Sequence, residues 1–311
     1  MRQRVVRGRF LRAHRGRERC RASVGRRVRV LVGAHRFRAC RCRRLSGAEK
    51  HFTVVALAGG SLEADFRKAG YGVPNKAYLP VGGVLMIVRV LRALREAGSV
   101  SRIRCVTERA AFADIPEGQD LCDEVIEPEG ELVGSMLAGL RGLPAEERVL
   151  VAATDMALLS AGSVDAFSAR AAQADCDIGY GFVERRTHDR RYPGVRHTWV
   201  RLREGTFCGG GLSIVRAGCA GQIQSVLRRF TAARKSPLKL AKLFSPMLVF
   251  KALSGTLPIA ELEERATAIT GLRCRGIMCP EPEVAVNVDR FEDLRAVEAI
   301  LRDRACVQVL S

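Results

Sequence analysis

The chain has 311 residues and a mass of 34.0 kDa, which suits one large domain or two small ones. Its formal net charge of +19 is typical of a nucleic-acid-binding protein, but the charge is distributed unevenly along the chain. Residues 1–50 hold seventeen Arg and one Lys against two Glu, a net charge of +16, so the other 261 residues carry only +3 and give no reason to expect a polyanion as partner.

The Arg-rich tail, residues 1–50, has three interpretations. It is a basic arm that binds RNA or anionic lipid through phosphate contacts, an organelle presequence, or translated upstream DNA attached by a mistaken start site. The tail has Arg but no Lys before position 50 and few aromatic residues for base stacking, which favours codon bias over selected contacts. We therefore expect a disordered tail or a mis-assigned start, followed by a single folded body from residue 51.

The cysteines of the body are scattered, and several lie inside apolar runs such as RIRCV. No CxxC pair occurs, and Cys40 and Cys42 in the tail are too close together for the usual zinc spacing. We expect buried, reduced thiols in a cytoplasmic protein. No apolar run approaches the roughly 20 residues that span a bilayer, and no signal-peptide core opens the chain, so we expect no membrane partner.

Apolar strands alternate with helices along the body. We predict strands at 52–57, 102–106, 148–154 and 176–183, helices at 85–98, 131–143, 163–174 and 290–304, and a hairpin at 198–207 around Glu204 and Gly205. Residues 236–269 read as two or three helices, an appendage that shapes acceptor entry or forms a dimer contact. This alternation predicts an α/β fold with a mostly parallel sheet covered by helices on both faces, whose ligands bind beyond the carboxyl ends of the strands.

A glycine pair, Gly59 and Gly60, directly follows the first predicted strand. Backbone amides can approach a phosphate there because no Cβ stands in the way. The stretch is neither a P-loop nor a dinucleotide fingerprint, because GxxxxGK[ST] and the GxGxxG spacing are both missing. When the pair is taken alone, a plain glycine turn is the better explanation.

Four segments occur in a specific order: VVALAGG, NKAYLPVGG, VLVAATDM and VNVDRFEDLRAV. In this order they resemble the MobA-like nucleotidyltransferases over about Phe52 to Leu301. The resemblance implies a GT-A-type α/β fold for the body, residues 51–311, and transfer of a nucleotidyl group from an NTP. A capping pair of Asp289 and Glu292 for the last helix is an alternative reading of VNVDRFE.

The resemblance also implies roles for individual residues. The glycine loop would contact the nucleotide, Lys76 would reach the α-phosphate and the incoming oxyanion, and Asp155 and Asp289 would hold Mg²⁺. The residues assigned to the nucleotide by the resemblance are Leu57, Ala58, Gly59, Gly60, Ser61 and Lys76. An ordinary solvated lysine is the alternative for Lys76.

The segment RRTHDRRYPGVRHTWVRLREGTFCGGG carries seven Arg and two His. A solvated basic face is the ordinary explanation of such a charge run. In the family this region lines the acceptor side, which makes Arg191, Arg196, Thr206 and a turn at Gly209, Gly210 and Gly211 candidates for holding an anionic acceptor. His188 and His197 are nine residues apart and make a poor metal pair.

The chain departs from the family pattern at three places. After LAGG the family has a small residue and an arginine that clamps the triphosphate, whereas here Glu63 and Asp65 intervene and Arg67 is displaced. Arg67 replaces the clamp through a longer loop, or triphosphate binding is weak. Asn75 separates Pro74 from Lys76, and Ala157 stands where a proline normally follows the metal aspartate.

The resulting prediction is a Mg²⁺-dependent nucleotidyltransferase that transfers NMP from an NTP to a phosphorylated or otherwise anionic small molecule and releases pyrophosphate. One alternative is a catalytically weak GT-A domain that binds a nucleotide or sugar nucleotide. Another is a glycosyltransferase that uses a sugar nucleotide, although TDM lacks the DxD pair common in such enzymes.

Overall fold

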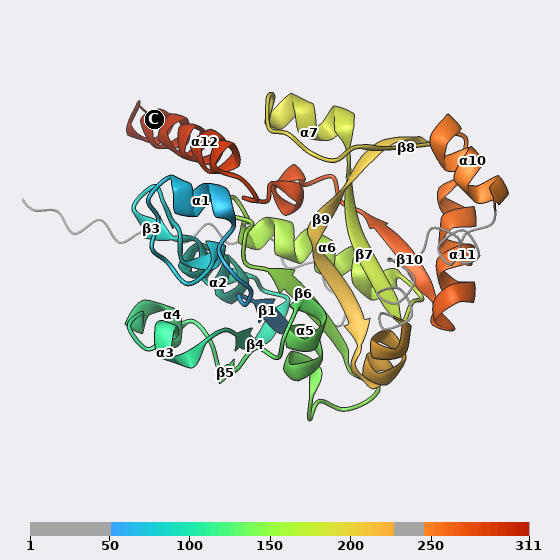
Figure 1. The fold of residues 1–311 in the computed structure, drawn as a ribbon, viewed down its shortest axis with the longest axis horizontal. Coiled ribbons are helices and arrows are strands. Elements are labelled where there is room, and N and C mark those ends of the chain that lie inside the picture. Colours follow the sequence, from blue (N-terminus) through green and yellow to red (C-terminus); the bar gives the residue numbers. More distant parts are fainter. Residues whose placement is uncertain (1–50, 227–245, 311) are drawn as a thin grey trace, which may run out of the picture. The chain divides into compact units, whose positions relative to one another are not determined.

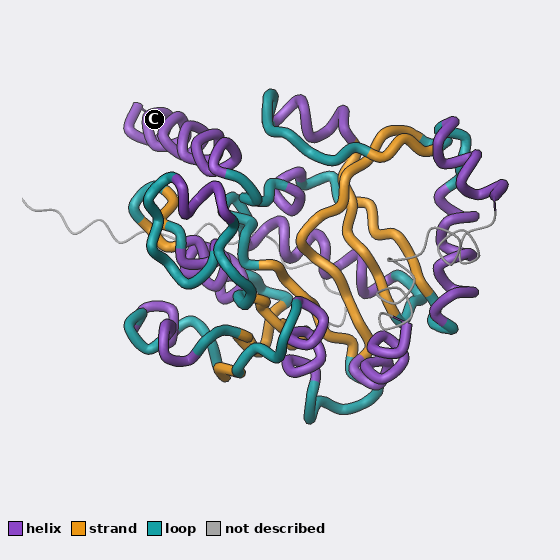
Figure 2. The backbone as a smooth tube through the Cα atoms, in the orientation of Figure 1, coloured by secondary structure: helices purple, strands orange, loops and turns teal. Residues whose placement is uncertain are grey.

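The computed structural model describes residues 51–226 and 246–310 (Figure 1). The predicted tail, residues 1–50, and the first part of the predicted helical appendage, residues 236–245, lie outside the described residues. Figure 2 shows the helices and strands of the body along the backbone.

A mixed sheet forms the centre of the body. Its strands follow the order β10-β7-β9-β6-β1-β4-β5, and β8 pairs with β9. The strands are β1 (Phe52–Leu57), β4 (Val100–Val106), β5 (Glu124–Ile126), β6 (Arg148–Ala153), β7 (Ile178–Glu184), β8 (Val200–Leu202), β9 (Gly205–Arg216) and β10 (Cys274–Met278). The strands β6, β1, β4 and β5 are parallel, as are β7 and β10, whereas β9 runs antiparallel to both of its neighbours. The predicted mostly parallel α/β sheet is confirmed.

Helices cover both faces of the sheet because its central strands are apolar on both sides. Val54 and Ala56 of β1 belong to the core under α2 (Met86–Glu96) and α6 (Ala161–Gln173), whereas Val55 belongs to the core that includes residues of α5 (Leu132–Leu140). Two short helices, α3 (Arg109–Phe112) and α4 (Pro116–Asp120), connect β4 to β5. The helices predicted at 85–98, 131–143 and 163–174 are thus confirmed, with shifted ends.

The first and last helices of the body share one core. Leu62 and Phe66 at α1 (Ala64–Lys68), Leu79, and Leu294 of α12 (Phe291–Leu310) belong to the same buried cluster. The chain between α1 and α2 contains the 3₁₀ turn η1 (Lys76–Tyr78) and the small hairpin of β2 (Pro80–Val81) and β3 (Val84–Leu85). The turn η3 (Pro282–Ala285) precedes α12, so segments from both ends of the body meet at the carboxyl edge of β1 and β6.

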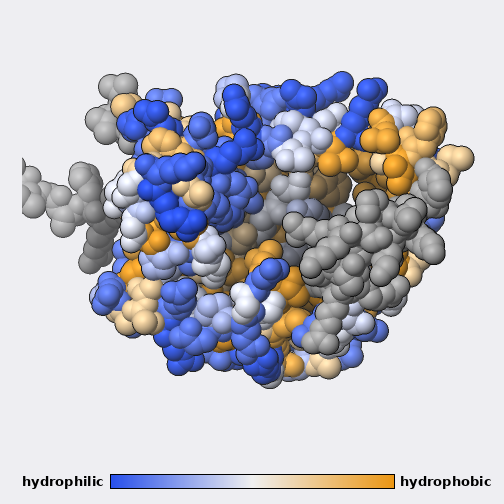
Figure 3. All heavy atoms as spheres, viewed as in Figure 1, coloured by the Kyte–Doolittle hydropathy of each residue, from blue (hydrophilic) through white to orange (hydrophobic). Residues whose placement is uncertain are grey.

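The predicted appendage contains two helices within the described residues, α10 (Pro246–Ser254) and α11 (Ile259–Thr270). They pack on the β8–β9 hairpin through Leu202, Phe207, Leu248 and Leu257. The predicted hairpin is present, and it turns at Arg203 and Glu204, directly before Gly205. Figure 3 shows apolar side chains gathered over α10, where Phe250 and Leu253 are exposed.

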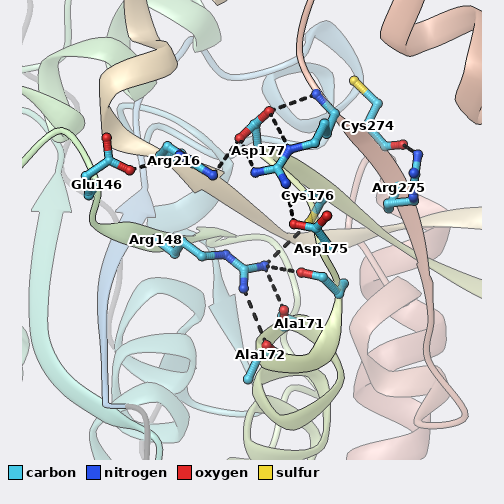
Figure 4. A network of polar contacts seen from close by, with 12 residues as sticks. Glu146, Arg148, Ala171, Ala172, Asp175, Cys176, Asp177, Arg216, Cys274 and Arg275 are labelled. Carbon is cyan, nitrogen blue, oxygen red and sulfur yellow. Dashed lines mark hydrogen bonds and ion pairs between the residues drawn. The ribbon is translucent and has the colours of Figure 1, made fainter.

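Charged side chains connect the strands at the end of the sheet that lies opposite the carboxyl ends of β1 and β6 (Figure 4). Asp177, at the start of β7, contacts Arg216 at the end of β9 at 2.8 Å and Arg273, just before β10, at 3.1 Å. Arg148, at the start of β6, donates to the carbonyl of Ala171 at 2.7 Å. The hydrogen bonds from Arg273, together with the neighbouring guanidinium of Arg216, hold the pKa of Asp177 below its usual value. The network therefore fastens the ends of four strands far from the carboxyl edge of β6.

One local prediction is wrong. Gly209, Gly210 and Gly211 form no turn but lie within strand β9. The glycines leave room for neighbouring atoms. A Cβ built on Gly209 would lie 2.1 Å from Tyr180 Oη, one on Gly210 would lie 3.0 Å from the Val284 carbonyl oxygen, and one on Gly211 would lie 2.5 Å from Met156 Sδ. They let the segment after β6 and the turn η3 pack directly against β9.

The described cysteines are all free, and five of them are buried, which agrees with the prediction of reduced thiols. In the described part of the chain, no helix has the length and apolar character needed to cross a bilayer.

Candidate active site

Lys76 lies between two carboxylates that come from distant parts of the chain. Its Nζ is 2.6 Å from Asp155 Oδ2 and also contacts Asp289 Oδ1. Asp155 follows the end of β6, and Asp289 lies between η3 and α12. The backbone joins the same segments, because the amide of Val288 donates to the carbonyl of Asp155 at 2.9 Å. The three residues that the sequence singled out are therefore brought together.

Asn75 positions Lys76 relative to the glycine loop. Its side-chain amide donates to the carbonyl of Ala58 at 3.0 Å, and its Oδ1 accepts from the amide of Ala77 at 2.9 Å. Asn75 is 1% exposed and caps the turn η1, on which Lys76 is the first residue. The residue that separates Pro74 from Lys76 is therefore the link between the lysine and the loop.

The glycine loop leaves β1 at the same edge. Thr154 fixes the last strand residue, Leu57, because its hydroxyl donates to the carbonyl of Leu57 at 2.7 Å. Ala58 is buried, whereas Gly60 and Ser61 are exposed. Gly60 has a φ of +106°, which disfavours any other residue, and a Cβ added there would meet nothing within 4 Å. The loop is open to a ligand on this side.

The side chain of Asp289 is not the cap of the last helix. The amides of Asp289 and Arg290 donate to Asp293 Oδ2 at 3.2 and 2.9 Å, and the amide of Phe291 donates to Asp65 Oδ2 at 2.9 Å. The predicted capping pair of Asp289 and Glu292 is therefore wrong: Asp293 and Asp65 satisfy these amides. Asp289 is left to contact Lys76, with 60% of its side chain exposed.

The electrostatics of the site favour a charged lysine and a further cation. Burial alone lowers the pKa of Lys76, but the charge and hydrogen bonds of Asp155 and Asp289 outweigh burial and raise that pKa above its ordinary value. Burial is also the largest influence on Asp155 and raises the pKa of its carboxyl against the attraction of Lys76. A third acid, Glu63, lies 3.9 Å from Lys76. The site therefore holds more acidic than basic groups.

The carboxylates suit Mg²⁺. Asp155 Oδ1 is buried and has no hydrogen-bond partner among the described residues. This oxygen is therefore available to coordinate a cation, together with the exposed carboxylate of Asp289. Mg²⁺ prefers oxygen ligands and is commonly held by one or two carboxylates together with substrate phosphates. Within residues 51–226 and 246–310, no three His, Cys, Asp or Glu side chains form a metal cluster of their own.

Arg67 lies apart from these groups. It is exposed in the last turn of α1, and its side chain forms no ion pair within the described part of the chain. Its suggested role as a displaced triphosphate clamp stays a prediction.

The predicted acceptor residues lie in different places. Arg196 lines a cavity of about 550 Å³ together with Arg185, His197, Trp199 and Arg290. Arg191 lines another cavity beside α12 and is 4.0 Å from Glu283. Thr206 pairs with Arg201 in the β8–β9 hairpin, and Gly209 and Gly210 lie in β9. Arg196 is thus placed beside Arg290, the neighbour of Asp289 in sequence.

Sequence reasoning did not find the contact between His188 and His197. Their Nε2 atoms are 2.8 Å apart, beside the cavity of Arg196, because the short helix α7 (Arg185–Arg191) and the following loop fold onto each other. A spacing of nine residues carries no signal for this contact. Trp199, which lies between Arg196 and Arg201 in the sequence, was the available hint that this region is packed and not only solvated.

Comparisons with known proteins agree with this geometry. Residues 54–242 match the family model described as the MobA-like NTP transferase domain. A solved structure described as a hypothetical transferase from Thermus thermophilus is 33% identical, with a TM-score of 0.67, covering 78% of this chain and 99% of that chain. A nucleotidyl transferase from Methanothermobacter is 20% identical, with a TM-score of 0.50, covering 81% and 99% of the two chains, and it supports the fold alone. No curated protein matches the chain.

The family match includes the glycine loop, Lys76, Asp155, Arg191 and Arg196, and it spans more than half of the sequence. The observed sheet order and the meeting of Lys76 with Asp155 agree with the order of segments on which the resemblance was based. This chain belongs to the MobA-like NTP transferase family.

Proposed function

We propose that the protein is a Mg²⁺-dependent nucleotidyltransferase that transfers NMP from an NTP to an anionic small molecule and releases pyrophosphate. The observation that carries this proposal is the meeting of Lys76, Asp155 and Asp289 beside the open glycine loop. The described cysteines are free thiols, so we also propose a reducing compartment such as the cytoplasm.

The glycine loop and Lys76 would bind the triphosphate. The exposed backbone around Gly60 and Ser61 can donate amide hydrogens to phosphate oxygens without steric hindrance. Lys76 keeps its charge at neutral pH because its pKa is raised, so it acts as a fixed cation and not as a base. As the acceptor oxygen attacks the α-phosphorus, negative charge grows on the phosphoryl oxygens, and a fixed cation placed there stabilises the transition state.

Asp155 and Asp289 would hold the metal. Asp155 offers the buried oxygen Oδ1, and Asp289 is exposed toward solvent. When bound, Mg²⁺ supplies positive charge that neutralises the phosphates and the leaving pyrophosphate. The two carboxylates would then have Mg²⁺ as a second cation beside Lys76. The lysine ammonium would no longer be needed to neutralise them and would be free to turn toward the α-phosphate.

The acceptor would enter through the cavity at Arg196. Arg196 and Arg290 both line it, are exposed and form no ion pair with another described residue. Two unpaired guanidinium groups favour a carboxylate or phosphate. Arg191, Thr206, Gly209 and Gly210 stay predicted acceptor contacts, and none of them lines this cavity.

The test measures NTP binding first and turnover second. Thermal unfolding of the full chain with ATP, CTP, GTP or UTP, with and without Mg²⁺, should show a rise in Tm for at least one NTP that depends on Mg²⁺. Pyrophosphate release is then measured with that NTP and mixtures of anionic acceptors. Asp155→Asn should abolish both effects, and the exposed Asp120→Asn on α4 serves as the matched control.

Two results would contradict the proposal. If no NTP changes the Tm of the wild-type protein, the nucleotide site is wrong. If Asp155→Asn keeps the Mg²⁺-dependent response of the wild type, the metal assignment is wrong although the fold stands.

A further inference from the structure

A second group of titratable residues lies beside the acceptor cavity. His188 is fully buried and contacts His197 through the two Nε2 atoms, at 2.8 Å. The Nδ1 atom of His188 is 3.2 Å from Asp189 Oδ1. The three side chains therefore form a continuous chain of contacts that runs from Asp189 through His188 to His197, and His197 lines the cavity.

The positions of the hydrogens follow from the partners. A carboxylate only accepts, so Nδ1 of His188 carries a hydrogen and donates it to Asp189. A neutral His188 then has an unprotonated Nε2, which accepts from the Nε2–H of His197. We assign Nδ1 of His197 as the unprotonated nitrogen, and it has no hydrogen-bond partner within the described part of the chain.

Neighbouring rings and charges hold this arrangement. Trp199 contacts both imidazoles edge to face, with ring centroids 5.4 Å from each. Arg185 lies over Trp199 at 5.4 Å and donates to Asp189 Oδ2 at 3.1 Å. Asp189 is thereby kept in place and charged, and both imidazoles are fixed in orientation.

We propose that His197, supported by His188 and Asp189, accepts the proton of an acceptor hydroxyl during nucleotidyl transfer. This inference rests on the proposed function and deepens it. It identifies the acceptor as a molecule that attacks through a hydroxyl group and carries a separate anionic group, which Arg196 and Arg290 bind.

The reaction balances without any further reactant. The acceptor oxygen forms a bond to the α-phosphorus while the bond from that phosphorus to the β-phosphate oxygen breaks, and pyrophosphate leaves with the electron pair. The hydroxyl proton passes to Nδ1 of His197. The resulting imidazolium keeps its Nε2–H bond to His188, whose own Nδ1–H points to the charged Asp189.

The other groups near the reaction do not provide this base. Lys76 is held protonated by its two carboxylates, and we assign these carboxylates, Asp155 and Asp289, to the metal in the proposed function. A phosphate group that attacks as nucleophile is already ionised at neutral pH and needs no base. A base beside the cavity is therefore useful to a hydroxyl nucleophile in particular.

Burial supports the neutral state of both rings. Burial lowers the pKa of His197 to about 4, with His188 adding to the effect and Asp189 and Asp289 opposing it. The pKa of His188 is lowered too, chiefly by burial, against the pull of Asp189. Arg185, Arg196 and Arg290 are the cations that line the same cavity. A base as weak as His197 is sufficient for phosphoryl-type transfer, since the residue that takes the hydroxyl proton in protein kinases is an aspartate.

The first test is independent of the acceptor. Nitrogen-15 NMR of the histidine side chains of the full-length protein at pH 7 should show His197 protonated at Nε2 only and His188 protonated at Nδ1 only. Assignment uses His197→Gln and Asp189→Asn, and Asp189→Asn should shift the His188 signals. Finding the hydrogen of His197 on Nδ1, or a charged His197 at pH 7, overturns the inference whether or not the enzyme turns over.

The second test compares two acceptor panels, using the NTP that shifts the Tm. One panel contains polyhydroxy acids such as gluconate, and the other contains alkyl phosphates without a hydroxyl group. We expect pyrophosphate release with a polyhydroxy acid, a loss of kcat between about 100-fold and 10,000-fold in His197→Gln, and no such loss in the exposed neighbour Thr198→Ala.

The outcomes separate the two proposals. Turnover with alkyl phosphates alone, or equal kcat for His197→Gln and the wild type, overturns the role of His197 and leaves the proposed function standing. Absence of any NTP binding removes the proposed function, while the NMR result still decides whether the Asp189–His188–His197 arrangement exists.

Discussion

The amide of Phe291 donates a hydrogen bond of 2.9 Å to the carboxylate of Asp65, across 226 positions of sequence. Asp65 belongs to α1, directly after the glycine loop, and Phe291 begins α12, directly after the loop that carries Asp289. Asp65, which departs from the family pattern, therefore joins the glycine loop to the loop that carries Asp289. The spacing between these two loops sets the geometry of the candidate site.

Replacing Lys76 by Met should separate its catalytic role from its structural one. We expect kcat for pyrophosphate release to fall at least about 100-fold, because a preorganised charge at the phosphoryl group is lost. The free energy of unfolding should fall by about 3 kcal/mol, because Asp155 is left buried beside Asp289 without a cation. Mg²⁺ should raise the Tm of Lys76→Met more than that of the wild type, and equal rises would argue against a metal site at these carboxylates.

Asn75→Ala should weaken the link between the glycine loop and Lys76. Both hydrogen bonds of the buried side chain are lost, and the carbonyl of Ala58 keeps only the longer contact from Thr107, so we expect a loss of about 2 kcal/mol in urea unfolding. NTP affinity should fall as well, since the loop is no longer fixed. Gln173→Ala, an exposed amide at the end of α6, is the control and should leave both quantities unchanged. A stable Asn75→Ala protein with normal NTP affinity would remove Asn75 from the site.

The start of α12 offers a comparison between adjacent acids. Asp293→Ala removes the acceptor for the amides of Asp289 and Arg290 and should cost about 1–2 kcal/mol, as loss of a helix cap does. Glu292→Ala, on the exposed side of the helix, should change stability by less than about 0.5 kcal/mol. Chemical denaturation of both variants decides between the observed cap and the one read from the sequence, which would give the opposite order.

Asp177 should make the protein sensitive to acid. Its pKa is lower in the folded state than in the unfolded state, mainly because Arg273 donates to it. Its contribution to stability is therefore complete above the unfolded pKa of about 3.9 and is lost as the pH falls through the folded pKa. Urea unfolding from pH 6 down to pH 3 should show a steeper loss for the wild type than for Asp177→Asn, which should be less stable by about 2 kcal/mol at pH 6. Parallel curves would show that the Asp177 network does not titrate in this range.

Much of the fold could be predicted because the central strands β1 and β6 are apolar along most of their length and helix α2 has a clear apolar face. The place of Asp155 at the carboxyl end of a strand could be predicted from the pattern, whereas its convergence with Asp289 required the family resemblance. Lys76 required the family resemblance, because local pattern does not separate a site lysine from a solvated one.

The remaining features depend on contacts that sequence spacing does not encode. Asn75 looked like a departure from the family pattern, and only the burial of its side chain shows that it joins two loops. The three glycines of β9 suggested a turn, but they lie in a strand where Tyr180, Val284 and Met156, from three other segments, approach the backbone closely. His188 meets His197 because the chain folds back after α7, and the hydrogen bond between them is visible only in three dimensions.

The position of Asp289 has a practical consequence for anyone who expresses this protein. The recognisable family segment ends at residue 242, whereas Asp289 and the outer strand β10 come later in the chain. A clone trimmed to that segment would keep the glycine loop and Lys76 yet lack Asp289 and the helix α12 that follows it. Such a shortened clone could look inactive for reasons unrelated to the chemistry of the intact molecule.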